Sequence, residues 1–402
     1  MTFQAPPAVP VFGSSVTDEA RSKRSRFMGA HARTVYAELT NQFTTRLRID
    51  ELVAAAAVRF PGLVPSAEEM AAEEALPQHR KLGREIDQGI FLHHVLADEV
   101  AGTHLAESML APTPRALALL GEFTETGYVD LGVVRIAREG DVAHLTIHNE
   151  HCLNAETVAH VEDMETAVDI VLLDPAVRVC VLRGAVMSHP KYAGRRVFSA
   201  GINLRELHAG RISYLGFLMR RELGYLSKIY RGVRVEGDWR TRVVEKPWVA
   251  AVDTFAIGGG MQLLLLFDYV IAEHDAFVSL PAAQEGIVPG AGNLRVARLT
   301  NGRVSRQVIL SGRRLYAGEP DAAGIFDEVV DPAHLDDAVA EAAARMAAPA
   351  VTPNRHMLHT CEEPLSLFRE YMAEFALQQA LRLYGADVLD KVDNGWRARD
   401  AA

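Results

Sequence analysis

The sequence has 402 residues, of which 49% are hydrophobic and 23% charged, with a net charge of −10 and a pI near 5.9. This composition is typical of a globular chain, and its acidity does not favour a nucleic-acid surface. No apolar run approaches the roughly 20 residues of a membrane helix, and the N-terminus lacks a signal-peptide core, so we expect a cytoplasmic protein without a membrane segment. Three widely spaced cysteines, Cys152, Cys180 and Cys361, predict reduced thiols.

The first part of the chain, residues 1–125, is predicted to be a helical N-terminal domain behind a loose arm at residues 1–15. Residues 33–53 and 82–110 place apolar side chains three and four positions apart. The pair His93 and His94 suggests a metal site. However, adjacent helical residues point about 100° apart, so we favour structural or solvent-facing histidines.

Residues 126–330 alternate between strand and helix signals, which predicts α/β layers. In chain order we expect a hairpin over 128–149, a helix over 154–173 and a strand over 177–185. A polar loop leads to the segment 197–207 and further helix to about residue 231. A buried strand at 248–252, a helix over 261–267, the strand FVSL, a turn at 285–293 and a helix from residue 294 follow. Residues 331–402 are predicted to be a C-terminal helical region.

Two turns in this region expose backbone amides. Gly258, Gly259 and Gly260 join the strand 248–252 to a helix, where free amides and the helix dipole favour negative charge. The small residues 199–201 likewise precede a helix and leave the amide of Ile202 free. A turn that only permits close packing is the alternative interpretation of the glycines.

The segments FSAGINLREL, AIGGGMQLLLLFDYVIAE and EGIVPGAGN, in this order, resemble the crotonase (enoyl-CoA hydratase/isomerase) superfamily. The resemblance implies a spiral ββα core that binds acyl-CoA thioesters, in homo-oligomers that are trimers or dimers of trimers. It also implies that the amides of Ile202 and Gly259 form an oxyanion hole. Hydratases of this superfamily carry two carboxylates at positions that are Gln262 and Ala282 here, although Glu285 lies nearby.

The long helical extension, HNEHCLNAETV, SHPKYAGRRVFSAGINLREL, GGGMQ and the C-terminal helices resemble one unusual branch of that superfamily. The resemblance implies oxidation of (3,5-dihydroxyphenyl)acetyl-CoA by O2 to 3,5-dihydroxyphenylglyoxylate and CoA, in dihydroxyphenylglycine biosynthesis for glycopeptide antibiotics. It implies no metal and no organic cofactor. The sequence offers no convincing 2-His-1-carboxylate spacing and no dinucleotide fingerprint.

Residue by residue, the same resemblance implies a site. Ile202, Gly259 and Gln262 take the catalytic positions, with Glu156 and Arg221 at the aryl end. The remaining predicted substrate contacts are Glu150, His189, Pro190, Lys191, Tyr192, Ala193, Ala200, Gly201, Leu204, Gly258 and Gly260. Leu204, Ile287 and Val388 are predicted to line an O2 pocket.

Each assignment has an alternative. Glu156 could instead interact favourably with the dipole of a helix that starts near Asn154. Arg220 could take the place of Arg221 if the alignment with the family is shifted by one residue. The apolar O2 candidates could be ordinary core. Lys191, Arg195 and Arg196 could meet CoA phosphates or form a solvated face. For the whole chain, an ordinary crotonase hydratase, isomerase or thioesterase and a non-catalytic scaffold remain the rival hypotheses.

Overall fold

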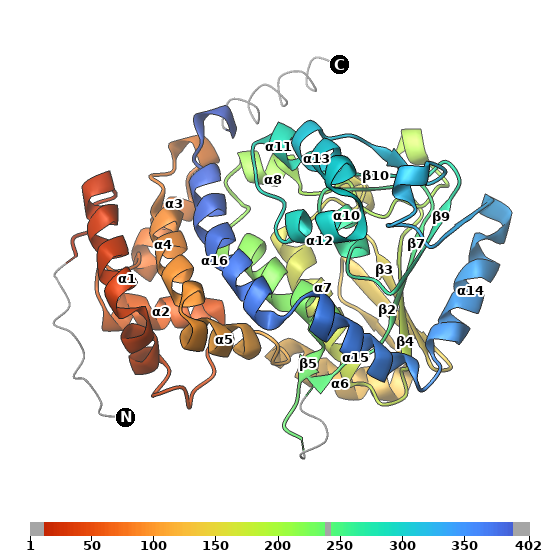
Figure 1. The fold of residues 1–402 in the computed structure, drawn as a ribbon, viewed down its shortest axis with the longest axis horizontal. Helices are drawn as coiled ribbons and strands as arrows, with labels where there is room; N and C mark the ends of the chain where they lie inside the picture. Colours follow the sequence, from red (N-terminus) through yellow and green to blue (C-terminus); the bar gives the residue numbers. More distant parts are fainter. Residues whose placement is uncertain (1–11, 238–242, 389–402) are drawn as a thin grey trace.

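The computed structural model describes residues 12–237 and 243–388. Most of the predicted arm at residues 1–15 therefore lies outside the described residues. So does part of the segment 233–247, which connects the helical run ending near residue 231 to the strand 248–252. The α-helices before the first strand are α1 (Asp18–Leu39), α2 (Ile49–Arg59), α3 (Ala67–Glu74), α4 (Arg84–Ala97), α5 (Glu99–Ser108) and α6 (Pro114–Thr126). Helices α1 to α5 lie at one end of the molecule, with the sheets at the other, whereas α6 lies against α7 and β1 (Figure 1).

Two of the predicted helical stretches are interrupted. The stretch 33–53 is divided between α1 and α2: α1 ends at Leu39, and Asn41, Gln42 and Phe43 have φ of 46°, 57° and 64°, which no right-handed helix accommodates. Phe43 still packs against the main hydrophobic cluster, which explains the apparent periodicity. The stretch 82–110 breaks at Asp98, whose carboxylate accepts the first free amides of α5.

The main sheet has the strand order β1-β2-β3-β4-β7-β9-β12. Its first three strands are antiparallel, and β3, β4, β7, β9 and β12 run parallel. A second sheet has the order β11-β10-β8, and β5 pairs with β6. The strands are β1 (Tyr128–Asp130), β2 (Val134–Glu139), β3 (Val142–Ile147), β4 (Val179–Gly184), β5 (Val233–Arg234), β6 (Val243–Val244), β7 (Trp248–Val252), β8 (Phe255–Ile257), β9 (Tyr269–Glu273), β10 (Phe277–Ser279), β11 (Leu315–Tyr316) and β12 (Glu328–Val330).

The central strand β7 is buried along its whole length because both faces of the sheet are covered. Val249 and Ala251 pack with β4, β9 and α14, whereas Trp248, Ala250 and Val252 belong to the larger cluster that contains α7. This confirms the buried strand predicted from the continuous apolar run. The mixed α/β class with added helices at both ends of the chain is confirmed as well.

The helices after the first strands complete the core. They are α7 (Val158–Leu173), α8 (Leu204–His208), α9 (Ser227–Arg231), α10 (Gly259–Leu264), α11 (Ala282–Glu285), α12 (Gly292–Leu299), α13 (Gly302–Ser311), α14 (Leu335–Met346), α15 (Val351–Glu362) and α16 (Leu365–Arg382). The predicted helix over 261–267 thus ends at Leu264. The long helical run to residue 231 contains two π-helical segments, Tyr214–Met219 and Glu222–Leu226.

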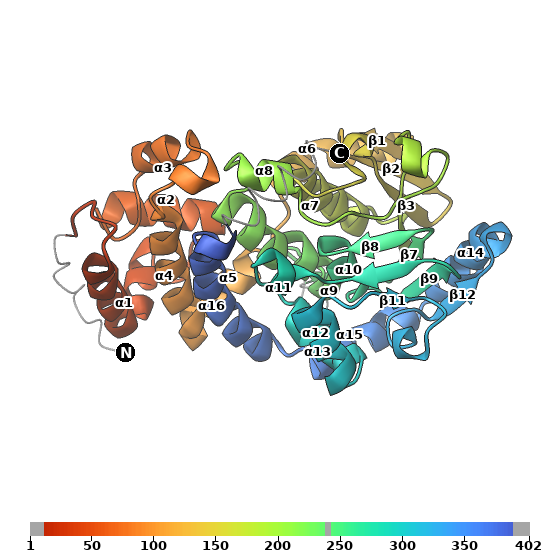
Figure 2. The same cartoon turned by 90° about the horizontal axis from the view of Figure 1, so that it is seen from above.

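Helix α16 joins the N-terminal helices to the core and lies along α4 (Figures 1 and 2). The two helices approach closely because Gly89 faces Ala380: a Cβ on Gly89 would lie 2.5 Å from the Cβ of Ala380. One hydrophobic cluster consequently runs from α1 through α16 into the sheet. The division into three regions at residues 125 and 330 stays a prediction.

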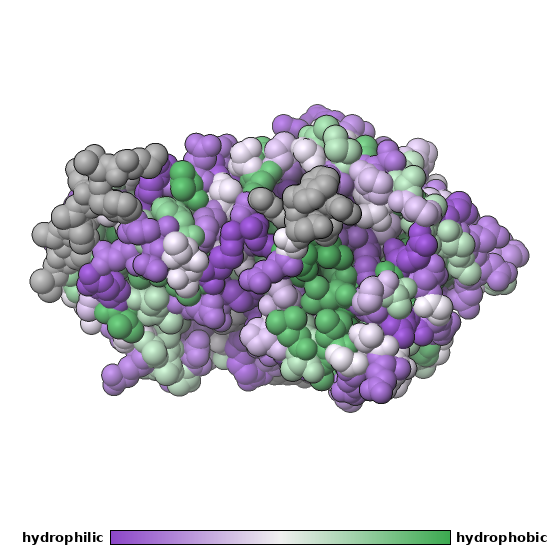
Figure 3. Space-filling view, turned by 90° about the horizontal axis from the view of Figure 1, so that it is seen from below, coloured by the Kyte–Doolittle hydropathy of each residue, from purple (hydrophilic) through white to green (hydrophobic). Residues whose placement is uncertain are grey.

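The surface seen from below is mostly hydrophilic, with apolar side chains gathered near the middle of the view and scattered elsewhere (Figure 3). Of the helices in the described ranges, none has the length and apolarity needed to cross a membrane.

Candidate active site

The two glycine-containing turns lie against each other. The amide of Ile257 donates to Ser199 O at 2.9 Å, which pairs β8 with the segment before Gly201. A Cβ on Gly258 would lie 3.2 Å from Gly201 Cα, and one on Gly260 would lie 2.7 Å from Ser199 Cβ. Gly201 and Gly258 also have φ of 85° and 55°. Larger residues would separate the two turns.

Ile202 and Gly259 both line one pocket. Glu156 forms a parallel bridge with Ile202, in which its amide donates to Gly201 O at 2.7 Å and its carbonyl accepts from Asn203 N at 2.9 Å. The peptide groups of Ile202 itself therefore point away from Glu156. Gly259 is the first residue of α10, where amides have no partner within the helix. Their joint role as an oxyanion hole stays a prediction.

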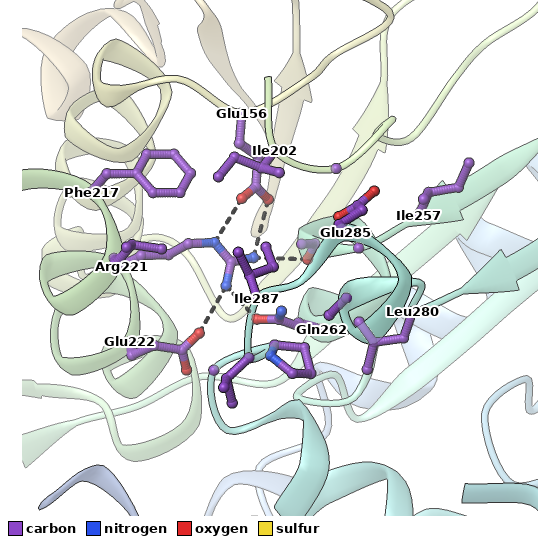
Figure 4. Close-up of a pocket in the computed structure, with 18 of the residues that line it drawn as sticks. Glu156, Ile202, Phe217, Arg221, Glu222, Ile257, Gln262, Leu280, Glu285 and Ile287 are labelled. Carbon is purple, nitrogen blue, oxygen red and sulfur yellow. Dashed lines mark hydrogen bonds and ion pairs between the residues drawn. The ribbon is translucent and has the colours of Figure 1, made fainter. Parts of the chain in front are cut away.

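Arg221 occupies the polar end of this pocket and holds four groups (Figure 4). It donates to the two carboxylate oxygens of Glu156 at 2.7 and 3.1 Å and to Gln262 Oε1 at 2.6 Å. It also donates to Gly259 O at 2.8 Å and to Glu222 Oε1 at 3.1 Å. The side chains of Arg221, Glu156 and Glu222 are at most 4% exposed.

The charges in this cluster compensate one another. Burial alone would lower the pKa of Arg221, but the carboxylates of Glu156 and Glu222 and the Tyr225 hydroxyl together outweigh it, and the pKa of Arg221 is raised. Burial raises the pKa of Glu222, and the charge of Arg221 opposes this rise. Replacing one charged side chain of such a buried group with a neutral one leaves another charge without a partner.

The structure decides two of the alternatives left open by the sequence. Helix α7 begins at Val158 with Thr157 as its N-cap, so the predicted start near Asn154 is wrong and Glu156 is not in the first helical turn. The cause is the left-handed conformation of Leu153 and Asn154. Arg221, rather than Arg220, lines the pocket; Arg220 donates to Glu165 and Glu162 instead.

The turn after α11 closes the pocket and is anchored on α16. Gly286 O accepts from Arg382 Nε at 2.6 Å, and the amide of Val288 donates to Gln379 Oε1 at 2.8 Å. Tyr371 donates to Gly290 O at 2.6 Å. Within the predicted C-terminal helical region 331–402, α16 ends at Arg382, and the residues from 389 on lie outside the described part of the chain.

Of the three O2-pocket candidates, only Ile287 lies in the described pocket lining, together with Phe217, Leu218 and Phe375. Leu204 packs against the main hydrophobic cluster instead. Val388 is buried beside Gly286, where a Cβ would meet its Cγ2 at 2.6 Å. The apolar surroundings of Ile287 come from helices far away in the sequence, which no local pattern indicated.

Several candidates for binding CoA lie outside the described pocket lining. Tyr192 and Ala200 share a small cluster with Ile257, and the Tyr192 ring meets Phe255 at 5.4 Å. Lys191 lies over the Tyr192 ring at 5.4 Å. Glu150 pairs with His148 at 2.9 Å. None of the described pocket-lining residues comes from the 189–193 loop, so its CoA contact stays a prediction.

Arg195 and Arg196 both contact protein groups. The Arg195 guanidinium lies 3.4 Å from the Glu273 carboxylate, and the Arg196 guanidinium donates to Gly184 O at 3.1 Å. Within the described ranges, no group of three His, Cys, Asp or Glu side chains could hold a metal ion. His93 and His94 have partners in Ala373 O and the Ser25 hydroxyl at 2.8 and 3.0 Å, which favours the structural interpretation.

Sequence reasoning missed Glu222 although it directly follows Arg221. Its role as a partner depends on the fold: its second carboxylate oxygen accepts the amide of Ala291 at 3.1 Å, so it ties Arg221 to the turn 286–292. Only the charge pattern Arg221-Glu222 within an apolar helix could have drawn attention to it.

Comparison with known proteins places the chain in a family. The enoyl-CoA hydratase/isomerase pattern matches residues 137–381. The chain is 57% identical over 386 residues to a (3,5-dihydroxyphenyl)acetyl-CoA 1,2-dioxygenase of Amycolatopsis orientalis, covering 96% of this chain and 89% of that one. It is 29% identical over 220 residues to a short-chain-enoyl-CoA hydratase of Clostridium acetobutylicum, covering 54% of this chain and 76% of that one. The solved structure of an enoyl-CoA hydratase/isomerase from Pseudoalteromonas atlantica shares the fold, with a TM-score of 0.55 at 21% identity over 66% of this chain and 97% of that one.

Proposed function

Because the chain belongs to the enoyl-CoA hydratase/isomerase (crotonase) family, we propose that it is a dioxygenase that converts (3,5-dihydroxyphenyl)acetyl-CoA and O2 to 3,5-dihydroxyphenylglyoxylate and CoA. The observation that carries the proposal is the 57% identity to the Amycolatopsis orientalis dioxygenase over 96% of this chain. The same proposal places the protein in dihydroxyphenylglycine formation for a glycopeptide antibiotic.

The pocket chemistry supports this function over hydration. The two positions at which hydratases of the family carry carboxylates are Gln262 and Ala282, and both residues line the pocket. Neither side chain can give or take a proton as a carboxylate does. Gln262 is further committed to Arg221 through its amide oxygen.

We infer that the thioester oxygen binds the amides of Ile202 and Gly259. The Cα–H bond of an arylacetyl thioester is acidified by the carbonyl and the ring, and loss of the proton moves charge onto that oxygen. Two preorganised donors stabilise this charge by about 3–4 kcal/mol each. The resulting electron-rich enolate can pass an electron to O2, and radical recombination forms a peroxide at Cα.

The peroxide then attacks the thioester carbonyl and expels CoA. Cleavage of the O–O bond with loss of the second α-hydrogen gives the α-keto acid, so both oxygen atoms of O2 end in the product. The apolar side chains around Ile287 suit this step because they exclude water from the enolate and the peroxide.

At the polar end of the pocket, Glu156 and Arg221 are our candidates to recognise the ring hydroxyls. A buried carboxylate discriminates strongly against an analogue without the hydroxyl, because such an analogue leaves the carboxylate with one partner fewer. Glu150, residues 189–193 and the Ala200–Gly201 backbone are proposed to meet CoA. A homo-oligomer, trimer or dimer of trimers, is proposed from the family resemblance.

The deciding experiment is O2 uptake and CoA release by the purified chain with (3,5-dihydroxyphenyl)acetyl-CoA in the presence of a chelator. We expect one O2 consumed per CoA released. CoA release without O2 uptake would identify a thioesterase. The absence of both would support a non-catalytic scaffold, and a strict iron requirement would refute the proposed chemistry.

A further inference from the structure

The N–H groups of Arg221 are all used by the protein itself. A guanidinium has five N–H donors. Nε of Arg221 donates to Glu156 at 2.7 Å, Nη1 donates to Glu222 at 3.1 Å and to Gln262 at 2.6 Å, and Nη2 donates to Glu156 at 3.1 Å and to Gly259 O at 2.8 Å. Arg221 therefore cannot donate to a ring hydroxyl without giving up one of these partners. Its part in recognising the ring is to hold the groups around it in place.

Two of the groups that Arg221 holds are carboxylates with unused acceptor sites. An ionised carboxylate has about four lone-pair sites. Glu156 accepts two N–H groups of Arg221, and Glu222 accepts one from Arg221 and the amide of Ala291 at 3.1 Å. Among the described residues no other group donates a hydrogen bond to either carboxylate. Each of them can therefore accept a hydrogen bond from a ligand.

Glu156 and Glu222 both line the pocket and lie on opposite sides of the Arg221 guanidinium (Figure 4). Each carboxylate lies directly against a glycine of the pocket lining. A Cβ on Gly259 would overlap the carboxylate of Glu156, and a Cβ on Gly290 would overlap that of Glu222. The pocket wall thus has room for one carboxylate on each side of the guanidinium.

The charge of this cluster favours a ligand that donates hydrogen bonds. Glu156 and Glu222 share one cation, Arg221, and the three side chains are at most 4% exposed. The buried Arg295 does not supply a second cation, because it donates to both carboxylate oxygens of Glu363 at 2.9 Å. When both pocket carboxylates are ionised, one negative charge is left in excess. Hydroxyl donors stabilise that charge, whereas an anionic ligand would add to it.

We propose that Glu222 is a specificity-determining residue that accepts a hydrogen bond from one ring hydroxyl of the substrate while Glu156 accepts one from the other; this rests on the function proposed above. The hydroxyls of a 3,5-dihydroxyphenyl ring are meta to each other and point apart, so they suit acceptors on two sides of one guanidinium. A ring with one hydroxyl leaves one buried carboxylate with a partner fewer, which lowers its reactivity as a substrate. The site therefore selects for two meta hydroxyls.

The test compares three thioesters by their kcat/KM values for O2 uptake: (3,5-dihydroxyphenyl)acetyl-CoA, (3-hydroxyphenyl)acetyl-CoA and phenylacetyl-CoA. The ratio of the first to the second reports the second hydroxyl, because a general loss of activity affects both substrates alike. We expect this ratio to be about 10 to 100 in the wild-type enzyme, the effect of one hydrogen bond to a charged group, and below about 3 in Glu222→Gln. The ratio of the second thioester to the third should survive in Glu222→Gln, because Glu156 still accepts the one hydroxyl.

Glu162→Gln is the matched control. This carboxylate also pairs with an arginine, Arg220 at 3.3 Å, but it is not among the described residues that line the pocket. Both ratios should keep their wild-type values in this variant. If Glu222→Gln does not fold, Glu222→Asp keeps the charge beside Arg221 and shortens the side chain by one methylene, and it should also lower the first ratio.

A first ratio that keeps its wild-type value in the folded Glu222 variant would overturn the role of Glu222 and leave the dioxygenase function intact. Collapse of both ratios would overturn it as well, because Glu222 would then support the whole site rather than one hydroxyl. Calorimetric binding of the three thioesters without O2 gives the same ratios independently of turnover. A wild-type enzyme that binds them but consumes no O2 would refute the proposed function, and the binding ratios would still decide the role of Glu222.

Discussion

Gly259→Ala tests whether the start of α10 and the Glu156–Arg221 pair are mechanically linked. A Cβ on Gly259 would lie 2.5 Å from the carboxylate carbon of Glu156, whereas ordinary contacts begin at 3.4 Å. Either α10 or the carboxylate must move by roughly 0.9 Å, the difference between these values. Glu156 cannot retreat cheaply because Arg221 holds both of its oxygens.

The expected loss follows from that displacement. Separating this buried ion pair should cost about 3–5 kcal/mol in the free energy of unfolding. A shifted Gly259 amide should lower kcat by about 10²–10³, the effect of losing one oxyanion donor. Urea denaturation measures the first quantity, and O2 uptake with (3,5-dihydroxyphenyl)acetyl-CoA measures the second.

Gly121→Ala provides the control. Gly121 lies within α6 and a Cβ there would meet nothing within 4 Å. Replacing an unhindered helical glycine with alanine should stabilise by up to about 1 kcal/mol. If Gly259→Ala matched this control in stability and kept the wild-type kcat, the reasoning about Glu156 would be refuted.

Three further outcomes are expected. Lys228→Met should destabilise by about 3–5 kcal/mol in urea because it leaves the fully buried Asp169 without its cationic partner, whereas Lys23→Met at an exposed helical pair should change stability by less than about 0.5 kcal/mol; equal effects would contradict the buried network. Burial lowers the pKa of His359 to about 3. The free energy of unfolding should therefore fall by up to about 1.4 kcal/mol per pH unit as pH drops from about 6.5 toward 3, because the histidine of the unfolded chain binds a proton at a higher pH than the folded one. His359→Asn should flatten this slope, which urea denaturation at a series of pH values measures. Cys361→Ala should leave kcat and stability unchanged because the thiol is exposed, and a loss in O2 uptake would contradict this.

The sheet core was predictable where burial leaves a local signal. Trp248–Val252 is apolar at every position because both faces of the sheet are covered, and the sequence shows that directly. The strands Phe255–Ile257 and Tyr269–Glu273 escaped prediction because they flank α10 within one nearly continuous apolar stretch. Such a stretch carries no periodicity that separates strand from helix.

The polar end of the site was predictable only through resemblance. Glu156 and Arg221 are 65 residues apart in the sequence, and nothing in either segment indicates their pairing. The helix start at Val158 rather than Asn154 depends on left-handed backbone at Leu153, which single-sequence patterns do not reveal. Phe375 reaches the pocket from α16, so its contribution requires the docking of the C-terminal helix.

The arrangement around Arg221 links the two pocket amides through one chain of contacts. The backbone of Glu156 fixes the residues on either side of Ile202, and its carboxylate fixes Arg221, which in turn holds Gly259 O at 2.8 Å. Any change that moves Glu156 must therefore move both amides. For the same reason, substitutions of Glu156, Arg221 and Gly259 should be strongly non-additive, because each of them breaks the same connection.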